Sequence, residues 1–229
     1  MMDHDGASRP CAVLVFVRAP RLGEVKTRLA ASLGDSAGLR VYRRLAGHAV
    51  AEARALAPAA RLRIHYTPAG SGDEVAAWLG GDADYLPQHP GGLGERLATA
   101  FREAFDAGFR RVVVVGSDLP GFSAEHLNQA FNALDSADAV IGPAADGGYW
   151  LLGLRRPIDS VFDGIPWSTA EVFERTVHKL RSAGIEPVVL PVLADVDEAA
   201  DLPEGWREWA VDGEIETGAG RPEALTEGR

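Results

Sequence analysis

The sequence is poor in the features that mark secreted and membrane proteins. Its single cysteine, Cys11, cannot form an internal disulfide, which fits a reducing cytosol. No apolar run approaches the ~20 residues needed to span a bilayer. Residues 1–10 are polar, lack the apolar core of a signal peptide and are expected to form a flexible leader. We therefore expect a cytoplasmic protein.

A basic excess is also missing. The formal net charge is −10 and the pI is about 5.1, so no broad positive field is available to attract nucleic acid or an anionic membrane. A phosphorylated ligand would need local cations or a metal ion. The six histidines show no zinc-ligand spacing, and neither a Gly-x-Ser-x-Gly motif nor a Walker A motif occurs.

Strand-like runs alternate with helical patterns along most of the chain. Four valines before Gly116 predict a central strand buried on both faces of a parallel sheet. Residues 61–66 alternate polar and apolar side chains, as a half-buried strand does, and 168–171 fit a capping box that starts a helix. We expect one three-layer α/β/α sandwich over 11–209, followed by a flexible tail at 210–229.

The segment after the first predicted strand, 11–17, offers cations where a phosphate could bind. Gly23 permits a turn, and Lys26 and Arg28 could reach an anion near the start of a helix. A solvated basic loop is the alternative. Open α/β sheets bind ligands at the carboxyl ends of their strands, which favours the binding role.

Two further segments belong to the same expected edge of the sheet. The glycines of 91–94 open a helix and could let the backbone approach a base or ribose, although a tight turn explains them at least as well. Asp118 directly follows the valine strand. Its carboxylate could bind Mg²⁺ or Mn²⁺, or it could only form a turn.

Two acidic segments complete the set of candidates. In 146–149, two glycines permit close approach of a ligand and Asp146 could accept a hydrogen bond from a substrate hydroxyl, with a β-turn as the alternative. Asp195 and Asp197 would share one face of an extended segment. Two like charges held together favour a bridging cation, with a solvated acidic loop as the alternative.

Taken in this order, the segments resemble a family of small bacterial GT-A-fold glycosyltransferases of the radical-SAM- and selenodomain-associated type, in the nucleotide-diphospho-sugar transferase superfamily. The resemblance runs from about Val13 to Leu202. It rests on residues 15–20, 23–29, 92–96, 116–120, 142–149, 167–169, 195–197 and 201–202. This chain has Gly92 where the family usually has aspartate, and 198–200 replace its usual Thr-Pro-Glu.

The resemblance implies a GT-A-type fold and a metal-dependent transferase that uses a nucleotide-activated donor. By this analogy Asp118 and Asp197 bind Mg²⁺ or Mn²⁺, and Asp195 acts as an outer or water-mediated partner. The expected nucleotide and phosphate contacts are Ala19, Gly23, Lys26, Arg28, Gly94 and Arg96. The expected acceptor contacts are Asp146, Gly147, Gly148, Tyr149 and Trp167. Lys26 and Arg28 would neutralise phosphate charge, and Asp146 is the candidate base.

Two reactions compete for this site. The family resemblance favours glycosyl transfer from a nucleotide sugar to a small-molecule acceptor. The paired cations Lys26 and Arg28 suit a triphosphate better, which favours a nucleotidyltransferase that joins a nucleoside triphosphate to a phosphorylated small molecule and releases pyrophosphate. A non-catalytic nucleotide-binding module is a third hypothesis, which the absence of the family's usual aspartate at Gly92 favours. The sequence predicts neither the base, the acceptor nor the oligomeric state.

Overall fold

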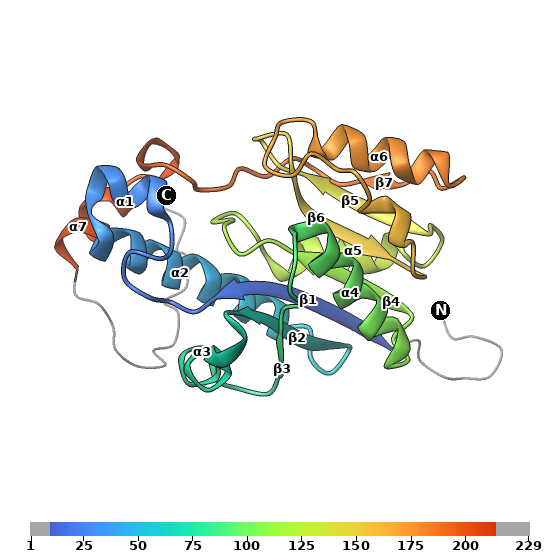
Figure 1. Ribbon diagram of the computed structural model, residues 1–229, viewed down its shortest axis with the longest axis horizontal. Coiled ribbons are helices and arrows are strands. Elements are labelled where there is room, and N and C mark those ends of the chain that lie inside the picture. Colours follow the sequence, from blue (N-terminus) through green and yellow to red (C-terminus); the bar gives the residue numbers. More distant parts are fainter. Residues whose placement is uncertain (1–9, 214–229) are drawn as a thin grey trace.

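A seven-stranded sheet forms the centre of the molecule (Figure 1). The computed structural model describes residues 10–213, so most of the predicted leader and most of the predicted tail lie outside the described residues. The strands are β1 Cys11–Arg18, β2 Ala60–Thr67, β3 Asp84–Pro87, β4 Arg111–Val115, β5 Ala139–Pro143, β6 Tyr149–Leu154 and β7 Val188–Val189. Their order is β3-β2-β1-β4-β6-β5-β7; β6 runs antiparallel to both neighbours and the other pairs are parallel.

Helices cover both faces of this sheet. The helices are α1 Thr27–Leu33, α2 Asp35–Arg54, α3 Gly72–Leu79, α4 Leu93–Asp106, α5 Ala124–Ala133, α6 Val172–Ser182 and α7 Trp206–Asp212, with short 3₁₀ turns at Ala69–Ser71, Asp159–Val161 and Ala199–Asp201. Side chains of α2, α3 and α5 form a core on one face, and those of α4 and α6 form a core on the other. Figure 1 shows α1 and α7 beside α2 at one end of the molecule.

The valine strand β4 lies in the middle of the sheet. It pairs with β1 on one side and with β6 on the other. Val112 and Val113 are fully buried because one valine faces each helical layer. The prediction of a three-layer α/β/α fold with a mostly parallel sheet is confirmed.

The prediction of a half-buried strand at 61–66 was wrong, because β2 is buried on both faces. Arg63 and His65 are 7% and 1% exposed. The Arg63 guanidinium lies over the ring of Phe109, and the His65 ring stacks on Phe16. The polar side chains keep their alternation, but aromatic neighbours exclude water from them. Burial, together with the charge of Arg63, lowers the pKa of His65 to about 4.

Two helix starts also differ from the prediction. Helix α1 begins at Thr27, a start that was not predicted, and α6 begins at Val172. Ser168 does not start the helix as a cap; it has a left-handed backbone conformation with φ 65°. The hydroxyl of Thr169 instead accepts a hydrogen bond from the Glu171 amide at 3.3 Å. Helix α6 therefore begins three residues later than the predicted capping box implies.

The segments singled out in the sequence meet at the carboxyl edge of the parallel strands. The chain after β7 returns across this edge, where the Val196 amide donates to the Asp118 carbonyl at 3.0 Å and Leu193 pairs with Ala144 (Figure 1). This crossing brings the acidic segment 195–197 beside the end of β4. Within residues 10–213, none of the helices combines the length and apolar character that a membrane span requires.

Candidate functional site

The first loop, between β1 and α1, is built around two left-handed residues. Gly23 has φ 75°, and Lys26 has φ 47°. A lysine in this conformation is uncommon and persists only where surrounding contacts fix it. The Lys26 carbonyl accepts the first hydrogen bond of α1, from Ala30 at 2.8 Å, so the helix starts directly after the lysine. The turn therefore fixes where the Lys26 side chain leaves the backbone.

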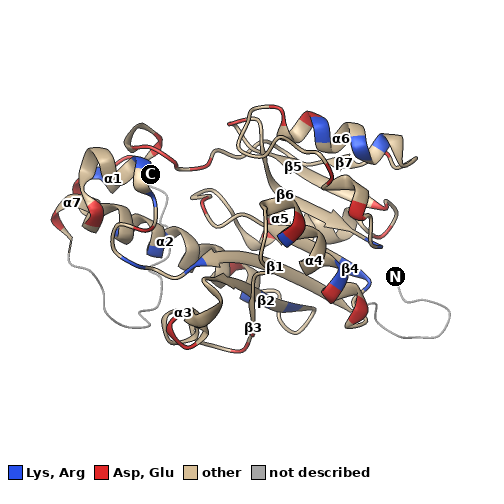
Figure 2. Cartoon of the chain, in the orientation of Figure 1, with Lys and Arg blue, Asp and Glu red and all other residues tan. Residues whose placement is uncertain are grey.

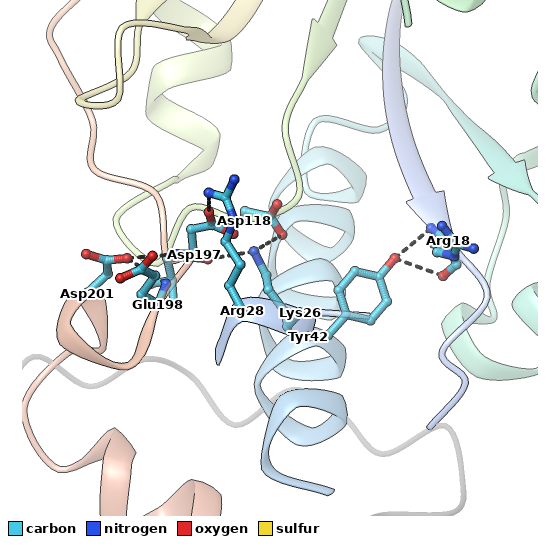
Figure 3. Close-up of polar contacts among 9 residues, drawn as sticks. Arg18, Lys26, Arg28, Tyr42, Asp118, Asp197, Glu198 and Asp201 are labelled. Carbon is cyan, nitrogen blue, oxygen red and sulfur yellow. Dashed lines mark hydrogen bonds and ion pairs between the residues drawn. The ribbon is translucent and has the colours of Figure 1, made fainter. Parts of the chain in front are cut away.

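The Lys26 side chain joins the first loop to the two predicted acidic segments. Its Nζ lies 2.9 Å from Oδ1 of Asp118 and donates to the carbonyl of Val196 at 2.6 Å. The lysine side chain is only 6% exposed, whereas that of Asp118 is 43% exposed (Figure 3). The structure thus places one buried cation between the end of β4 and the returning chain. The exposed part of Asp118 is free to contact a ligand.

The second predicted cation, Arg28, is paired with the second predicted metal ligand. Its Nη1 lies 2.5 Å from Oδ2 of Asp197. The Asp201 carboxylate accepts hydrogen bonds from the amides of Asp197 at 3.0 Å and Glu198 at 2.7 Å. Asp201 therefore fixes the backbone that carries Asp197 (Figure 3). Figure 2 shows this opposition of charges, with blue on α1 and the loop before it and red on the segment that leads to α7.

Asp195 lies within electrostatic range of Lys26 and of two further carboxylates, Asp118 and Asp146. The pKa of Asp195 is raised by burial and also by the negative charges of Asp146 and Asp118, against which Lys26 acts in the lowering direction. One lysine does not neutralise three acidic groups. A divalent cation would relieve this imbalance, and carboxylate oxygens are the donors that Mg²⁺ and Mn²⁺ prefer.

The donor set fits a metal that is completed by substrate. Among the described residues, no three acidic, histidine or cysteine side chains form a ready-made metal cage. Mg²⁺ is usually held by one or two carboxylates together with substrate phosphates and water. Asp118 and Asp197 are close to one another through the Val196 to Asp118 hydrogen bond. The charge of Asp118 raises the pKa of Asp195, so Asp195 is a second candidate for the same role.

The glycine turn before α4 is held by its own polar side chains. Glu95 accepts a hydrogen bond from the Gly92 amide at 2.8 Å, and Arg96 donates from Nε to the Gly91 carbonyl at 2.8 Å. Nη1 of Arg96 lies 3.3 Å from the Gln88 side-chain oxygen. Arg96 therefore shapes the turn, and its predicted contact with a nucleotide stays a prediction. The Glu95 carboxylate thus binds the amide of Gly92, the position at which the family usually has an aspartate.

Gln88 links this turn to the sheet. Its Nε2 donates to the carbonyls of His65 at 2.9 Å and Val17 at 3.2 Å, at the ends of β2 and β1. This residue was not predicted from the sequence, because its partners are backbone atoms that carry no side-chain signal. The close packing around Gly94 was also not predicted from the sequence. A Cβ atom there would lie 2.8 Å from Nε1 of Trp167 and 2.9 Å from the Phe162 carbonyl oxygen.

The predicted acceptor segment begins β6. Oδ1 of Asp146 accepts a hydrogen bond from the Gly148 amide at 2.8 Å, and Gly147 is left-handed with φ 89°. Asp146 thus forms the turn that its sequence suggested, and its other oxygen remains available. The Tyr149 ring lies edge-on to Trp167 at 6.3 Å. Its hydroxyl is buried without a hydrogen-bond partner in the described structure, and burial raises the pKa of this phenol.

The end of β1 is fixed on both sides. The buried Tyr42 hydroxyl accepts from the Arg18 amide at 2.6 Å and donates to the Arg18 carbonyl at 2.8 Å. Ala19 is fully buried and its amide donates to Thr67 at 2.8 Å, so this amide is already occupied. Tyr42 lies on the buried face of α2, and its hydrogen-bonding role was not predicted from the sequence.

Comparison with protein families places part of the chain in a known family. Residues 50–169 match the family described as "Uncharacterized protein conserved in bacteria (DUF2064)". The chain is also 31% identical over 193 residues to the phosphoenolpyruvate guanylyltransferase of Chloroflexus aggregans. That alignment covers 82% of this chain and 94% of the relative. The relative is therefore similar over nearly its whole length.

Solved structures give matches to the same fold. The crystal structure of a candidate nucleotide-diphospho-sugar transferase from Desulfovibrio desulfuricans G20 is 36% identical, with a TM-score of 0.78, and the match covers 90% of this chain and 94% of that one. The inositol-1-phosphate CTP transferase from T. maritima matches with a TM-score of 0.54 at 13% identity, over 92% and 99% of the two chains. The second likeness bears on the fold alone.

Proposed function

The chain belongs to the DUF2064 family of bacterial proteins, and on this premise we propose that it is a nucleotidyltransferase that joins a nucleoside triphosphate to a phosphorylated small molecule. It has a nucleotide-diphospho-sugar transferase-like fold and is a transferase. The association with radical-SAM proteins and the cytoplasmic location expected from the sequence stay predictions. Glycosyl transfer, which the family resemblance placed first, becomes the second candidate.

The main support for the proposal is the buried Lys26, which lies beside the end of β4. Its ammonium group is held 2.9 Å from Asp118 by a left-handed turn, with a second cation, Arg28, two residues further on. A triphosphate carries more negative charge than the diphosphate of a nucleotide sugar, and two neighbouring cations match it better. A charged site of this kind stabilises a leaving pyrophosphate because its positive groups are already in position.

The chemistry requires no general base. An oxygen of the acceptor phosphate attacks the α-phosphorus of the triphosphate and forms a phosphoanhydride bond. The bond between the α-phosphorus and the bridging oxygen breaks, and pyrophosphate leaves with the electron pair. The acceptor phosphate is already ionised at neutral pH, so Asp146 has no proton to remove. Glycosyl transfer to a hydroxyl would need such a base, which makes Asp146 a residue that separates the two reactions.

Each charged group then has a distinct task. Lys26 and Arg28 would leave their carboxylate partners in part and neutralise the phosphates. Asp118, with Asp197 or Asp195, would hold Mg²⁺ or Mn²⁺, which would supply positive charge to the triphosphate when bound. The glycine turn at 91–94 would contact the base or ribose. Tyr149 and Trp167 would lie against the acceptor.

The name of the Chloroflexus aggregans relative supplies a finer form of the proposal. We propose GTP as donor and phosphoenolpyruvate as acceptor, because this relative is similar along most of both chains. Such an acceptor carries a phosphate and a carboxylate, and both are anions that suit a cationic loop. The charged residues of the site support the transfer of a phosphate-containing group. The choice of guanine as the base and phosphoenolpyruvate as the acceptor rests on the name of the relative.

The test is a pyrophosphate-release assay with GTP and phosphoenolpyruvate, in parallel with assays for GDP release from GDP-sugars, each with Mg²⁺ or Mn²⁺. We expect pyrophosphate from the first mixture and little GDP from the second. Asp118→Asn should abolish release, and Asp138→Asn is the control, because Asp138 is a similarly exposed carboxylate paired with Arg156. Asp146→Asn should keep most of the activity. Release of GDP alone, with loss of activity in Asp146→Asn, would favour glycosyl transfer.

A further inference from the structure

The four cations of residues 18–28 differ in how far acidic groups neutralise them. Arg21 lies 2.9 Å from Glu74, Lys26 lies 2.9 Å from Asp118 and Arg28 lies 2.5 Å from Asp197. Arg18 differs from these three. Its Nη2 lies 4.0 Å from Oε2 of Glu24, and its side chain is 55% exposed.

The backbone of Arg18 is nevertheless among the best fixed in the site. The Tyr42 hydroxyl bonds both its amide and its carbonyl, and the next amide bonds Thr67. Tyr42 is buried and burial raises the pKa of its phenol, so the hydroxyl stays protonated and can donate and accept at once. Arg18 therefore combines a rigid stem with a loosely engaged guanidinium group. A structural ion pair would show the opposite pattern.

The position of Arg18 extends the cationic side of the site. It is the last residue of β1 and directly precedes the first loop, at the edge where the ends of β2 and β4 also lie. Figure 3 shows Tyr42 between Arg18 and Lys26. Arg18 and Lys26 thus form two separate points of positive charge. A substrate with more than one anionic group could contact both at the same time.

We propose that the Arg18 guanidinium binds a phosphate group of the substrate and leaves Glu24 when it does so. This proposal rests on the proposed nucleotidyl transfer and adds a residue to it. An exposed ion pair at 4.0 Å contributes little stability, so exchanging Glu24 for a phosphate costs little. Guanidinium groups bind phosphates through two parallel hydrogen bonds, which lysine cannot copy. The phosphate belongs to the donor or to the acceptor, and separate ligands can distinguish the two.

The experiment measures binding of GTP, phosphoenolpyruvate and inorganic pyrophosphate separately by calorimetry, with Mg²⁺ present. Arg18→Gln should weaken at least one of these ligands by about 10- to 100-fold, and Arg18→Lys should recover only part of the loss. Loss with GTP and pyrophosphate assigns Arg18 to the donor, and loss with phosphoenolpyruvate assigns it to the acceptor. Arg21→Gln is the matched control and should bind within about two-fold of the wild type.

Glu24→Gln separates a binding role from a structural one. If Arg18 binds phosphate, freeing it from Glu24 leaves affinity unchanged or makes it tighter, and the melting temperature hardly moves. Wild-type affinity in Arg18→Gln for all three ligands would overturn the inference, as would equal losses of affinity in Glu24→Gln and Arg18→Gln. If the wild-type protein binds pyrophosphate but never forms pyrophosphate from GTP, the proposed function is refuted, and the binding measurements still test the role of Arg18. Failure to bind any of the three would refute both.

Discussion

Replacing Lys26 by methionine perturbs the centre of the site with little change in packing. Methionine keeps an unbranched stem of similar length, so the 6% exposed side chain still fills its space. The substitution removes the ammonium group that lies 2.9 Å from Asp118 and 2.6 Å from the Val196 carbonyl. It therefore separates the charge of Lys26 from its volume.

The effect on stability should be moderate. A buried charged group that loses its partner costs several kcal/mol, whereas an exposed ion pair is worth below about 1 kcal/mol. Asp118 is 43% exposed, so water replaces part of the lost contact, and the Val196 hydrogen bond adds about 1 kcal/mol. We expect a loss of about 2 kcal/mol. In a domain of this size that lowers the melting temperature by about 4–8 °C.

The effect on substrate should be larger than the effect on stability. Loss of one positioned charge in a phosphate site typically reduces turnover by about 100- to 1000-fold. Binding of GTP, measured by calorimetry, and release of pyrophosphate, measured at saturating GTP, report the two losses separately. Lys179→Met is the control, because it changes the only other lysine of the sequence, on α6. GTP affinity and turnover within two-fold of the wild type in Lys26→Met would refute the assignment.

Three further predictions test the surroundings of the site. Gly94→Ala should lower the melting temperature by several degrees, since overpacking costs about 1–3 kcal/mol where its Cβ meets Trp167, whereas Gly121→Ala, with open space around it, should have little effect. Asp201→Ala should raise the Mn²⁺ concentration needed for half-maximal activity by several-fold, because the loop that carries Asp197, the proposed second metal ligand, loses the acceptor of its two amide hydrogen bonds; an unchanged metal requirement would contradict this role. The pKa of His65 is lowered to about 4 in the folded protein, so the unfolded chain, with a pKa near 6.5, takes up the proton at a higher pH. The contribution of neutral His65 to the free energy of unfolding is therefore complete above pH 6.5 and is lost as the pH falls toward 4. Urea titrations of the wild type should therefore lose about 2 kcal/mol more between pH 7.5 and 5 than those of His65→Leu, and equal losses would show that this histidine is not buried in its neutral form.

The fold followed from the sequence wherever apolar periodicity was strong. The valine run marked the centre of the sheet, because this signal comes from burial that the residues themselves require. The buried face of β2 could not be predicted in this way. Arg63 and His65 look solvated in sequence, and their burial depends on Phe109 and Phe16, which come from distant segments.

The site was predictable as a set of charged residues but not as a set of contacts. The order of the motifs brought Lys26, Asp118 and Asp197 to one edge, and the structure places them together. The partner of each cation was not predicted. Contacts to backbone atoms, such as Lys26 to the Val196 carbonyl and Tyr42 to Arg18, leave no side-chain pattern in the sequence.

The choice between the two reactions could not come from the residues alone. Both need cations, carboxylates and a glycine turn at the same sheet edge, and both fit the same fold. The family resemblance favoured glycosyl transfer, whereas the paired cations favoured a triphosphate. Similarity to a guanylyltransferase along 94% of that relative supports the second reaction.

The most direct test of nucleotidyl transfer follows the phosphorus atoms of GTP. With phosphoenolpyruvate and Mg²⁺ present, label in the α-phosphate should move into a new phosphoanhydride on the acceptor, while label in the γ-phosphate should appear only in pyrophosphate. Phosphorus NMR of the same mixture should show the coupled pair of the new anhydride. Label from neither position in a new product, together with transfer of sugar from a GDP-sugar, would contradict the account.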